Sequence, residues 1–250
     1  MAKWWHVSWK RLALLLVGTF AGLWLLAGAV RLVMDQLQPW LFTRHLKQQT
    51  PQLAQIPIAL PDQSLVPLDG KPIEFYGVSM ATPWKEISRQ HAFPSVSNWN
   101  FKDGASLLVI SPFEADHLAM PDDPRVARAL GTESLRPGYA LMNAEMYSTP
   151  DDVKWWKLPK QNARAGTLVL QKAFNQCHNY GKFYSVSFGR LRGFQEGAPT
   201  VAPYKIHLDL FDAGDRHYDI TILGDKGKPI PLTQAQLNSM IASIQADPKQ

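Results

Sequence analysis

Residues 204–223 read YKIHLDLFDAGDRHYDITIL, and this stretch decides the class of fold. Apolar and polar residues alternate with period two on both sides of the segment DAGD at 212–215, which is the pattern of two half-buried strands joined by a turn. The stretch GKFYSVSFGRLRGF at 181–194 alternates in the same way. We therefore predict a sheet of antiparallel strands in the last third of the chain, with one face packed on a core.

A helix is expected to follow these strands. Thr233 and Gln236 match a capping box, in which the side chain of each residue bonds the backbone N–H of the other. The apolar residues that follow repeat at the spacing of one helix face, and they are Leu237, Met240, Ile241 and Ile244. The predicted fold class is α+β, with an N-terminal transmembrane helix followed by an antiparallel sheet packed against helices.

Earlier segments of the chain are expected to add strands and helices to this sheet. The segment IEFYGVSM at 73–80 alternates and predicts one strand, and the apolar run ASLLVISP at 105–112 predicts another whose two faces are covered. A helix is predicted from Thr149, where the sequence Thr-Pro-Asp-Asp supplies a cap, to Leu158. Residues 162–174 leave helix and strand both open.

Three segments resemble the end of PsbP-like domains, namely IHLDLF at 206–211, HYDITILG at 217–224 and LNSMIASI at 237–244. The strand that leads to Pro83 resembles them too, so that the likeness extends from about Ile73 to Ala246. Proteins of that family are mostly non-catalytic accessory or assembly factors at membranes. The resemblance therefore implies a binding role and assigns no catalytic residue, and residues 112–146 have no counterpart in the family.

An uncharged stretch of nineteen residues, LALLLVGTFAGLWLLAGAV at 12–30, is close to the length that an α-helix needs to cross the hydrocarbon core of a bilayer. We predict a single transmembrane helix over residues 12–34, preceded by a basic, cytoplasmic segment at 1–11. The main domain would then lie outside the inner (plasma) membrane, in the periplasm of a bacterium. A cleaved signal peptide is the alternative, since Ala27 and Ala29 form a small-residue cleavage pattern.

Composition narrows the class of protein. A hydrophobic share of 46% and a charged share of 19% over 250 residues exclude a mainly disordered chain and a multi-span membrane protein. The single cysteine, Cys177, excludes a disulfide framework and a four-cysteine zinc site. The net charge of +5 lies entirely in residues 1–50 and the rest of the chain is electroneutral, so nucleic acid is not expected as a partner.

Five prolines over residues 51–72 exclude a continuous helix there. We expect residues 35–72 to form a juxtamembrane segment and a stiff, proline-rich linker. The linker either lifts the outer domain, residues 73–250, off the bilayer or docks on it as an edge strand. In the membrane helix, Gly18 and Gly22 form a G-x-x-x-G spacing that could support a homodimer, and an incidental pair of glycines is the alternative.

The hairpin at 204–223 carries the best candidate for a site, formed by two histidines and two aspartates: His207, Asp209, His217 and Asp219. A register that puts the apolar residues on one face places all four on the other, with Asp209 opposite Asp219. Imidazole and carboxylate groups at such separations could bind a divalent ion such as zinc, with each histidine oriented by a carboxylate. The alternative is the solvated polar face of a one-sided sheet.

Two further patterns could carry nucleophilic chemistry. Ser79 lies in the sequence GVSMA, which is close to a nucleophile elbow but lacks the second glycine, and a strand is the alternative. Cys177 and His178 could suggest a thiol nucleophile, but adjacent side chains point apart on most backbones, so a partly buried structural thiol is the alternative. The sequence therefore predicts no catalytic residue and no cofactor apart from a divalent metal at the hairpin.

Trp155 and Trp156 are the candidates for partner binding, and lysines lie around them at Lys154, Lys157 and Lys160. In the helix predicted here, we expect one ring to pack inward and the other to be partly exposed. An exposed tryptophan beside lysines suits a protein partner or the headgroup layer of a membrane. The alternative is that both rings belong to the core.

Together these features predict a membrane-anchored, non-catalytic envelope protein. It would bind another protein or a small ligand as an accessory or assembly factor. The alternative is a membrane-tethered, metal-dependent hydrolase that uses the hairpin at 207–219.

Overall fold

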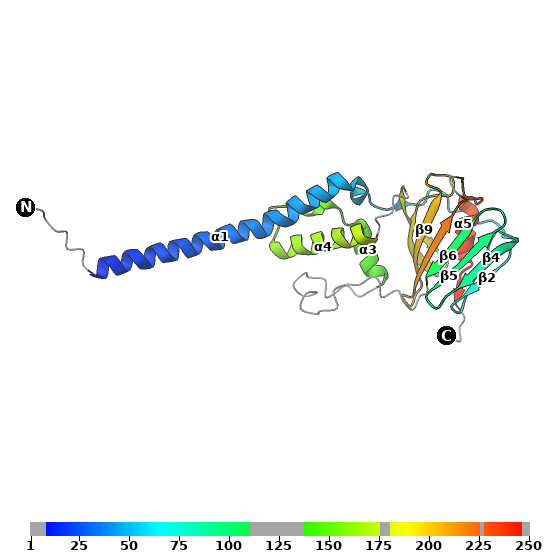
Figure 1. Cartoon of the computed structure of the whole chain (residues 1–250), viewed down its shortest axis with the longest axis horizontal. Helices are drawn as coiled ribbons and strands as arrows, with labels where there is room; N and C mark the ends of the chain where they lie inside the picture. Colours follow the sequence, from blue (N-terminus) through cyan, green and yellow to red (C-terminus); the bar gives the residue numbers. More distant parts are fainter. Residues whose placement is uncertain (1–8, 111–137, 176–180, 226–227, 247–250) are drawn as a thin grey trace, which may run out of the picture.

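The computed structural model describes residues 9–110, 138–175, 181–225 and 228–246, and Figure 1 shows their arrangement. A long N-terminal helix leads to a group of helices, and the sheets lie beyond them. The described helices and 3₁₀ turns are α1 (Trp9–Gln49), η1 (Pro51–Ala54), α3 (Tyr139–Tyr147), η3 (Pro150–Asp152), α4 (Pro159–Asn175) and α5 (Gln234–Ala242). The described strands are β1 (Ile58–Ala59), β2 (Ile73–Phe75), β3 (Val78–Met80), β4 (Ile87–Ala92), β5 (Val96–Phe101), β6 (Ser106–Ile110), β7 (Phe183–Phe188), β8 (Leu191–Glu196), β9 (Lys205–Phe211), β10 (His217–Leu223) and β11 (Gln245–Ala246).

An eight-stranded sheet forms the main part of the outer domain, in the order β1-β7-β8-β9-β10-β6-β5-β4. Neighbouring strands pair antiparallel, except that β1 pairs parallel with β7 at one edge. A second, three-stranded sheet has the order β11-β3-β2. The predicted α+β class, with a long apolar N-terminal helix and a mostly antiparallel sheet packed with helices, is confirmed.

The hairpin β9–β10 forms as its alternation predicts. Asp209 lies opposite Asp219, so that the even-numbered apolar residues of both strands share one face of the sheet. Asp212 closes the turn, since its Oδ1 accepts hydrogen bonds from the backbone N–H groups of Gly214 (2.8 Å) and Arg216 (3.0 Å). The carboxylate thus takes the place of water as the hydrogen-bond acceptor for two backbone N–H groups of the turn.

The apolar face of the sheet is covered by α5 and by the hairpin β2–β3. Leu237, Met240 and Ile241 of α5 are buried in one apolar cluster with residues of the sheet. The predicted capping box of α5 is observed: the N–H of Gln236 donates to Oγ1 of Thr233 at 3.2 Å, and the N–H of Thr233 donates to Oε1 of Gln236 at 2.8 Å. The cap starts the helix where its apolar face meets the sheet.

The opposite face of the sheet is covered in part by α3. Leu141, Met142 and Met146 of this helix are buried in a smaller cluster with Phe194 of β8 and Phe211 of β9. Beyond this cluster, the same face carries polar side chains of β8, β9 and β10. The face of the sheet under α5 is therefore apolar, whereas the opposite face is apolar only where α3 covers it.

Helix α1 is continuous over 41 residues. Its part Val17–Gln49 is long and apolar enough to cross a membrane, and its most apolar 18 residues have a mean hydropathy of 1.7 and are not buried. The helix runs through Pro39, and the hydroxyl of Thr43 donates to the Pro39 carbonyl at 2.9 Å. The last turns of α1 lie beside α4 and η3 (Figure 1), where Lys47 forms an ion pair with Asp151.

The proline-rich linker docks on the outer domain. Leu53 and Leu60 are buried, and β1 pairs with β7. The side-chain amide of Asn238 in α5 donates to the carbonyl oxygens of Asp62 (2.9 Å) and Ser64 (3.0 Å). The edge-strand alternative is therefore confirmed, and the packing of the outer domain extends upstream of β2.

The single strand predicted over residues 73–80 is wrong. These residues form the hairpin β2–β3, because Tyr76 and Gly77 adopt positive φ angles of 47° and 71° and reverse the chain. Two consecutive positive φ angles are the geometry of a two-residue hairpin turn that matches the twist of the strands. Glycine takes this conformation readily, whereas tyrosine does so only where the surroundings enforce it.

The helix predicted from Thr149 to Leu158 is also wrong, because only the 3₁₀ turn η3 forms there. Its capping box between Thr149 and Asp152 is present, but Val153 is extended, with φ −82° and ψ 111°. The residue before a proline rarely adopts helical φ and ψ angles. Leu158 precedes Pro159, the first residue of α4, so a helix that reached Leu158 could not continue into α4. The open segment at 162–174 is helical and belongs to α4.

Lys172 of α4 connects three segments of the body. Its side chain is buried, and its ammonium group donates to the carbonyl oxygens of Gln55 (2.6 Å), Met146 (2.8 Å) and Ser148 (3.0 Å). Burial lowers the pKa of Lys172 to about 8, against a smaller opposing effect of Asp152. The ammonium group thus holds the linker against the end of α3.

We predict that Lys172→Met lowers the free energy of unfolding of the full-length chain by about 3 kcal/mol, because three carbonyl oxygens each lose a hydrogen bond from a buried, charged donor. Thermal unfolding in detergent micelles at pH 7 measures the change. Lys160→Met, at an exposed position of the same helix, is the matched control and should change the stability by less than about 0.5 kcal/mol. Equal losses in the two variants would contradict this role of Lys172.

Candidate functional site

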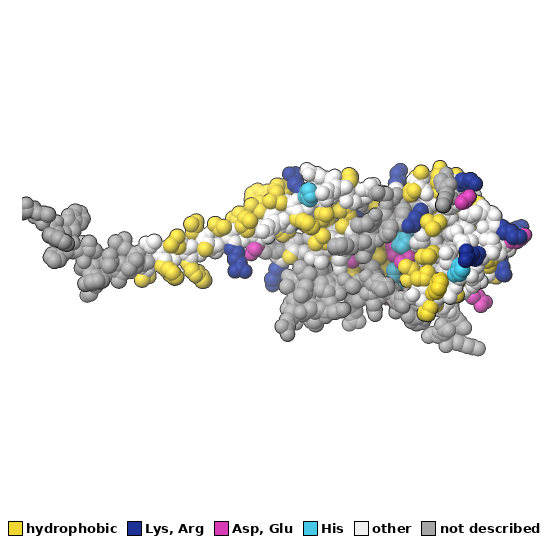
Figure 2. Space-filling model, in the orientation of Figure 1, with side chains coloured by type: hydrophobic (Ala, Val, Ile, Leu, Met, Phe, Trp, Pro, Cys, Tyr) yellow, Lys and Arg dark blue, Asp and Glu magenta, His cyan; other side chains and the backbone are white. Residues whose placement is uncertain are grey.

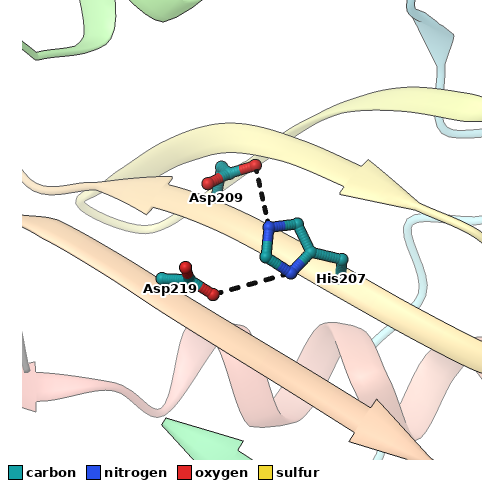
Figure 3. A group of neighbouring side chains, drawn as sticks. All are labelled: His207, Asp209 and Asp219. Atoms are coloured by element: carbon teal, nitrogen blue, oxygen red, sulfur yellow. Dashed lines mark ion pairs between the residues drawn. The ribbon is translucent and has the colours of Figure 1, made fainter. Parts of the chain in front are cut away.

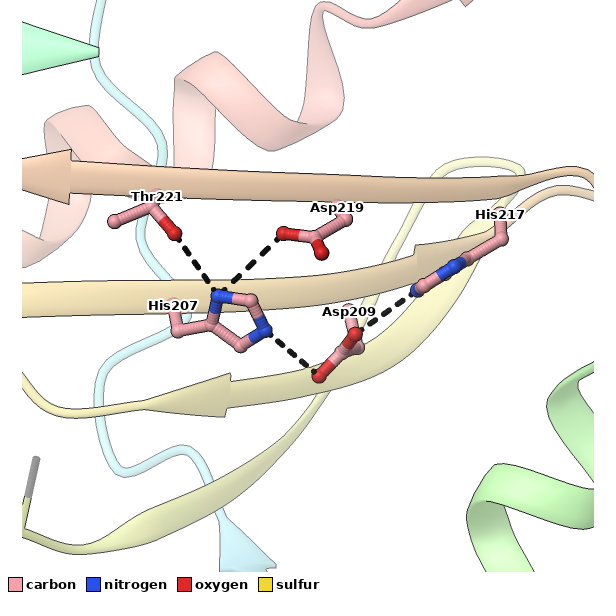
Figure 4. A network of polar contacts seen from close by, with 5 residues as sticks. All are labelled: His207, Asp209, His217, Asp219 and Thr221. Atoms are coloured by element: carbon pink, nitrogen blue, oxygen red, sulfur yellow. Dashed lines mark hydrogen bonds and ion pairs between the residues drawn. The ribbon is translucent and has the colours of Figure 1, made fainter. Parts of the chain in front are cut away.

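A group of polar side chains lies on the second face of the eight-stranded sheet, the face that α3 covers in part. We call this group the polar centre, and its members are Glu196 of β8, His207 and Asp209 of β9, and His217, Asp219 and Thr221 of β10. Alternation places the odd-numbered residues of β9 and β10 on this face, and Glu196 pairs across the strands with His207. Figure 4 shows the residues from β9 and β10 turned toward one another.

The imidazole of His207 lies between two carboxylates (Figure 3). Its Nε2 is 3.3 Å from Oδ2 of Asp209, and its Nδ1 is 3.5 Å from Oδ1 of Asp219. Nδ1 is also 3.0 Å from the hydroxyl oxygen of Thr221. Each ring nitrogen therefore faces oxygen acceptors on a different side, which is the arrangement that a doubly protonated imidazolium can satisfy.

Asp209 is shared by two histidines. Its Oδ1 lies 2.9 Å from Nε2 of His217, while its Oδ2 faces His207. The ring of His217 stacks on that of Phe211, with the ring centroids 4.6 Å apart. Because the stacked ring is fixed, His217 also fixes the orientation of the Asp209 carboxylate (Figure 4).

The polar centre is largely shielded from solvent, since the side chains of His207 and Asp209 are 16% and 10% exposed. Burial by itself would lower the pKa of His207, but Asp209, Asp219 and Glu196 together raise it to about 9. Burial by itself would raise the pKa of Asp209, but His207 and His217 hold it well below its usual range. Burial raises the pKa of Glu196 to about 8. His207 is thus a cation at neutral pH, and the solvated-face alternative is wrong.

Three of the four predicted metal ligands come together. One ligand atom each from His207, Asp209 and Asp219 lies within 4.8 Å of the others, whereas His217 joins the centre through its contact with Asp209. A zinc ion would have to draw these ligand atoms to within about 2.0–2.2 Å of itself. His207 would also have to lose a proton, because only a neutral imidazole binds a metal.

The space-filling view places histidine and acidic side chains together on the face of the sheet, next to the helical part of the body (Figure 2). This position agrees with that of the polar centre on β9 and β10. The same view shows hydrophobic side chains exposed along α1 (Figure 2). The polar centre and the exposed apolar surface of α1 are therefore separate surfaces of the molecule.

Trp155 and Trp156 both lie on the surface, with exposed fractions of 54% and 65%. Their rings form an edge-to-face pair with centroids 5.7 Å apart, and Nζ of Lys154 lies 5.7 Å from the ring centroid of Trp156. The expectation that one ring packs inward is wrong, and so is the alternative of two core rings, because this segment is not helical and has no buried helix face. Leu158, 66% exposed, completes what we call the tryptophan patch: Trp155, Trp156 and Leu158.

The other candidates do not form sites among the described residues. Ser79 lies in β3, between β2 and β11 of the small sheet, so the strand alternative to a nucleophile elbow is confirmed. Cys177 and His178 lie outside the residues that the structure describes. Gly18 and Gly22 lie on the exposed surface of α1, where an added Cβ would meet no neighbouring atom within 4 Å, and the homodimer stays a prediction.

Sequence reasoning missed two members of the polar centre, Glu196 and Thr221. The alternation of β10 places Thr221 on the same face as Asp219, so the period of two could have found it. Glu196 enters the centre because β8 pairs with β9. No local pattern reveals this pairing, since the order of the strands in the sheet depends on the whole fold.

A groove of about 800 Å³ lies between α1 and α4. Asp35, Gln38 and Phe42 line it from α1, and Lys160 and Ala163 line it from α4. The first turn of α4 therefore lies beside the part of α1 that directly follows the apolar span.

No family model matches the chain, and comparisons with curated proteins and with solved structures give no match. The resemblance to PsbP-like domains therefore stays a prediction.

We predict that the titration of His207 lowers the stability of the full-length chain by about 2 kcal/mol between pH 6.5 and pH 8, at about 1.36 kcal/mol for each pH unit over which the folded state holds one more proton. The pKa of His207 is raised in the folded state. The stability that His207 contributes is therefore complete below its unfolded pKa of 6.5 and is lost as the pH rises through the folded pKa of about 9. Glu196, raised from 4.5 to about 8, acts in the same direction. Above pH 8, the lowered pKa of Lys172 has the opposite effect.

Thermal unfolding as a function of pH measures this loss. His207→Gln should remove about half of the dependence between pH 6.5 and pH 8, because the glutamine does not titrate, whereas Glu196 still does. His91→Gln, on the edge strand β4, should leave the dependence unchanged. An identical pH dependence in the wild type and in His207→Gln would rule out the cationic role of this histidine.

Proposed function

We propose that the chain is a single-pass protein of the bacterial inner (plasma) membrane, with a cytoplasmic N-terminus and a periplasmic α+β domain. The apolar helix Val17–Gln49 and the basic residues that precede the span support this orientation. The outer domain is a non-catalytic accessory or assembly factor that binds another envelope protein or a small ligand. A homodimer through Gly18 and Gly22 is compatible with this anchoring.

The observation that carries the proposal is that the anchor and the outer domain belong to one packed body. Helix α1 contacts α4 and η3, Lys47 pairs with Asp151, and Lys172 holds the linker against α3. A tethered enzyme needs only a flexible linker, which lets its site reach substrate in any direction. A factor that presents a surface at a fixed height above the membrane needs the rigid connection that is found here.

The polar centre also favours a non-catalytic role. Both ring nitrogens of His207 face acceptors, and Asp209 is held by two histidines. A general base needs a free lone pair within hydrogen-bond reach of the proton that it removes. The network would have to open before His207 could act in this way, whereas in its closed form it joins β9 to β10.

A divalent metal at the polar centre is the second candidate, favoured by the convergence of His207, Asp209 and Asp219 within 4.8 Å. The metal would replace the proton of His207 as the cation between two carboxylates. In that case the chain would be a membrane-tethered, metal-dependent hydrolase. Its hydrolytic water would be activated on the metal, which lowers the pKa of bound water.

We predict that cross-linking of intact membranes, followed by purification of the full-length chain, captures one envelope protein in near-stoichiometric amount. Mass spectrometry identifies the partner, and a reciprocal purification through that partner should recover this chain. The control is the same chain solubilised before cross-linking, which should yield less of the complex. A chain that purifies alone from cross-linked membranes would contradict the protein-binding proposal.

Metal content separates the two candidate functions. The accessory-factor proposal predicts less than about a tenth of an equivalent of metal in protein purified without chelator, and no rise in melting temperature with zinc, manganese or calcium. The hydrolase predicts near-equimolar metal and stabilisation by about 2.7 kcal/mol when the free metal is 100 times the Kd. Asp219→Asn should abolish that stabilisation if the metal binds at the polar centre.

A further inference from the structure

We propose that the tryptophan patch rests in the headgroup layer of the same membrane that α1 spans. This inference rests on the proposed membrane anchoring and extends it, because it assigns a second, peripheral contact between the outer domain and the lipid. The occupant of the patch is an anionic lipid surface. Position, side-chain chemistry and charge each support this assignment.

The position of the patch follows from the packing of α4 on α1. Lys160, in the first turn of α4, lines the groove together with Asp35 and Gln38 of α1. The predicted span ends at Met34, and at 1.5 Å per residue Gln38 lies about 6 Å beyond it along the helix. Leu158 directly precedes α4, so the patch lies at the height of the headgroup layer, which is about 5–8 Å thick on each side of the hydrocarbon core.

The chemistry of the patch suits an interface between lipid and water. Three large apolar side chains that follow one another closely in the sequence are each more than half exposed. Tryptophan is enriched at both interfaces of membrane proteins, because its ring is largely apolar and carries one polar N–H group. In a soluble domain, such a group of exposed apolar side chains marks an interaction surface.

The charge around the patch is positive. Three lysines lie within or beside it, at Lys154, Lys157 and Lys160. The two acidic residues of the same segment are engaged elsewhere, since Asp151 pairs with Lys47 and Asp152 accepts the capping hydrogen bonds of Thr149. Basic residues near an apolar contact are attracted to the negative surface of anionic lipids.

A lipid surface fits better than a protein because the apolar surface continues onto the anchor itself. Phe42 of α1, 46% exposed, lines the groove that α1 shares with α4, and Leu41 beside it in the sequence is 56% exposed. Helix α4 lies alongside this part of α1 (Figure 1). The patch and the anchor would therefore meet one continuous lipid surface, and two contacts would fix the tilt of the outer domain.

Spin labelling of the full-length chain tests this contact. In a Cys177→Ser background, a label at Leu158→Cys is compared with a label at Phe93→Cys. Phe93 is a matched control, because it is also an exposed apolar side chain (61%) and follows β4, at the end of the sheet far from α1 (Figure 1). The chain is reconstituted in vesicles of phosphatidylglycerol and phosphatidylcholine, and the accessibility of each label to oxygen and to a water-soluble nickel chelate is measured.

We expect the label at position 158 to be shielded from the nickel chelate and accessible to oxygen, and the label at position 93 to show the reverse. Replacing a lysine beside the patch (Lys154, Lys157 or Lys160) by glutamine should lower the equilibrium constant for docking on anionic vesicles about fivefold for each charge removed. The same replacements should have little effect in pure phosphatidylcholine. Circular dichroism checks that each labelled variant is folded.

The contrary outcomes separate this inference from the anchoring on which it rests. Equal accessibility of the two labels, in a chain that floats with the vesicles, would overturn the headgroup contact and leave the anchor intact. A chain that does not float would contradict the anchor and the contact together. If Trp155→Ala with Trp156→Ala removed a cross-linked protein from native membranes, the patch would belong to a protein partner and the lipid contact would be wrong.

Discussion

The pairing of β9 with β10 brings Asp209 and Asp219 face to face, and the outer domain depends on how this pair is neutralised. The register cannot shift, because a slip of one residue would turn every apolar side chain of the hairpin out of the core. Directly opposed carboxylates repel, and the repulsion is stronger where solvent is excluded. His207 lies between them with one ring nitrogen toward each, so its positive charge offsets the repulsion that the core imposes.

A second buried cation has a similar role in the helical part of the molecule. Lys172 donates to three carbonyl oxygens from the linker and from the end of α3. This contact and the packing of α4 on α1 join the long apolar helix and the outer domain in one body. The structure thus uses buried charge twice, once to close the polar centre and once to hold the outer domain against the helices.

These two constraints explain why the proposed functions use separate surfaces. The polar centre is closed on itself, so it stabilises the sheet without offering a free base. The side chains of the tryptophan patch are exposed instead of being enclosed by the fold. The patch lies where α4 meets the part of α1 that follows the apolar span. A domain held at the anchor and at the patch would present its sheet to other envelope components in one orientation, as an assembly factor requires.

The apolar span, the antiparallel strands, the cap of α5 and the opposition of Asp209 to Asp219 could all be predicted, because each depends on periodicity or spacing within a few residues of the chain. Other features depended on contacts between distant segments. The reversal at Tyr76 needs surroundings that enforce a positive φ angle, and the entry of Glu196 into the polar centre needs the order of the strands. The outward position of both tryptophans follows from the absence of the predicted helix before Pro159, because no buried helix face then turns either ring toward the core.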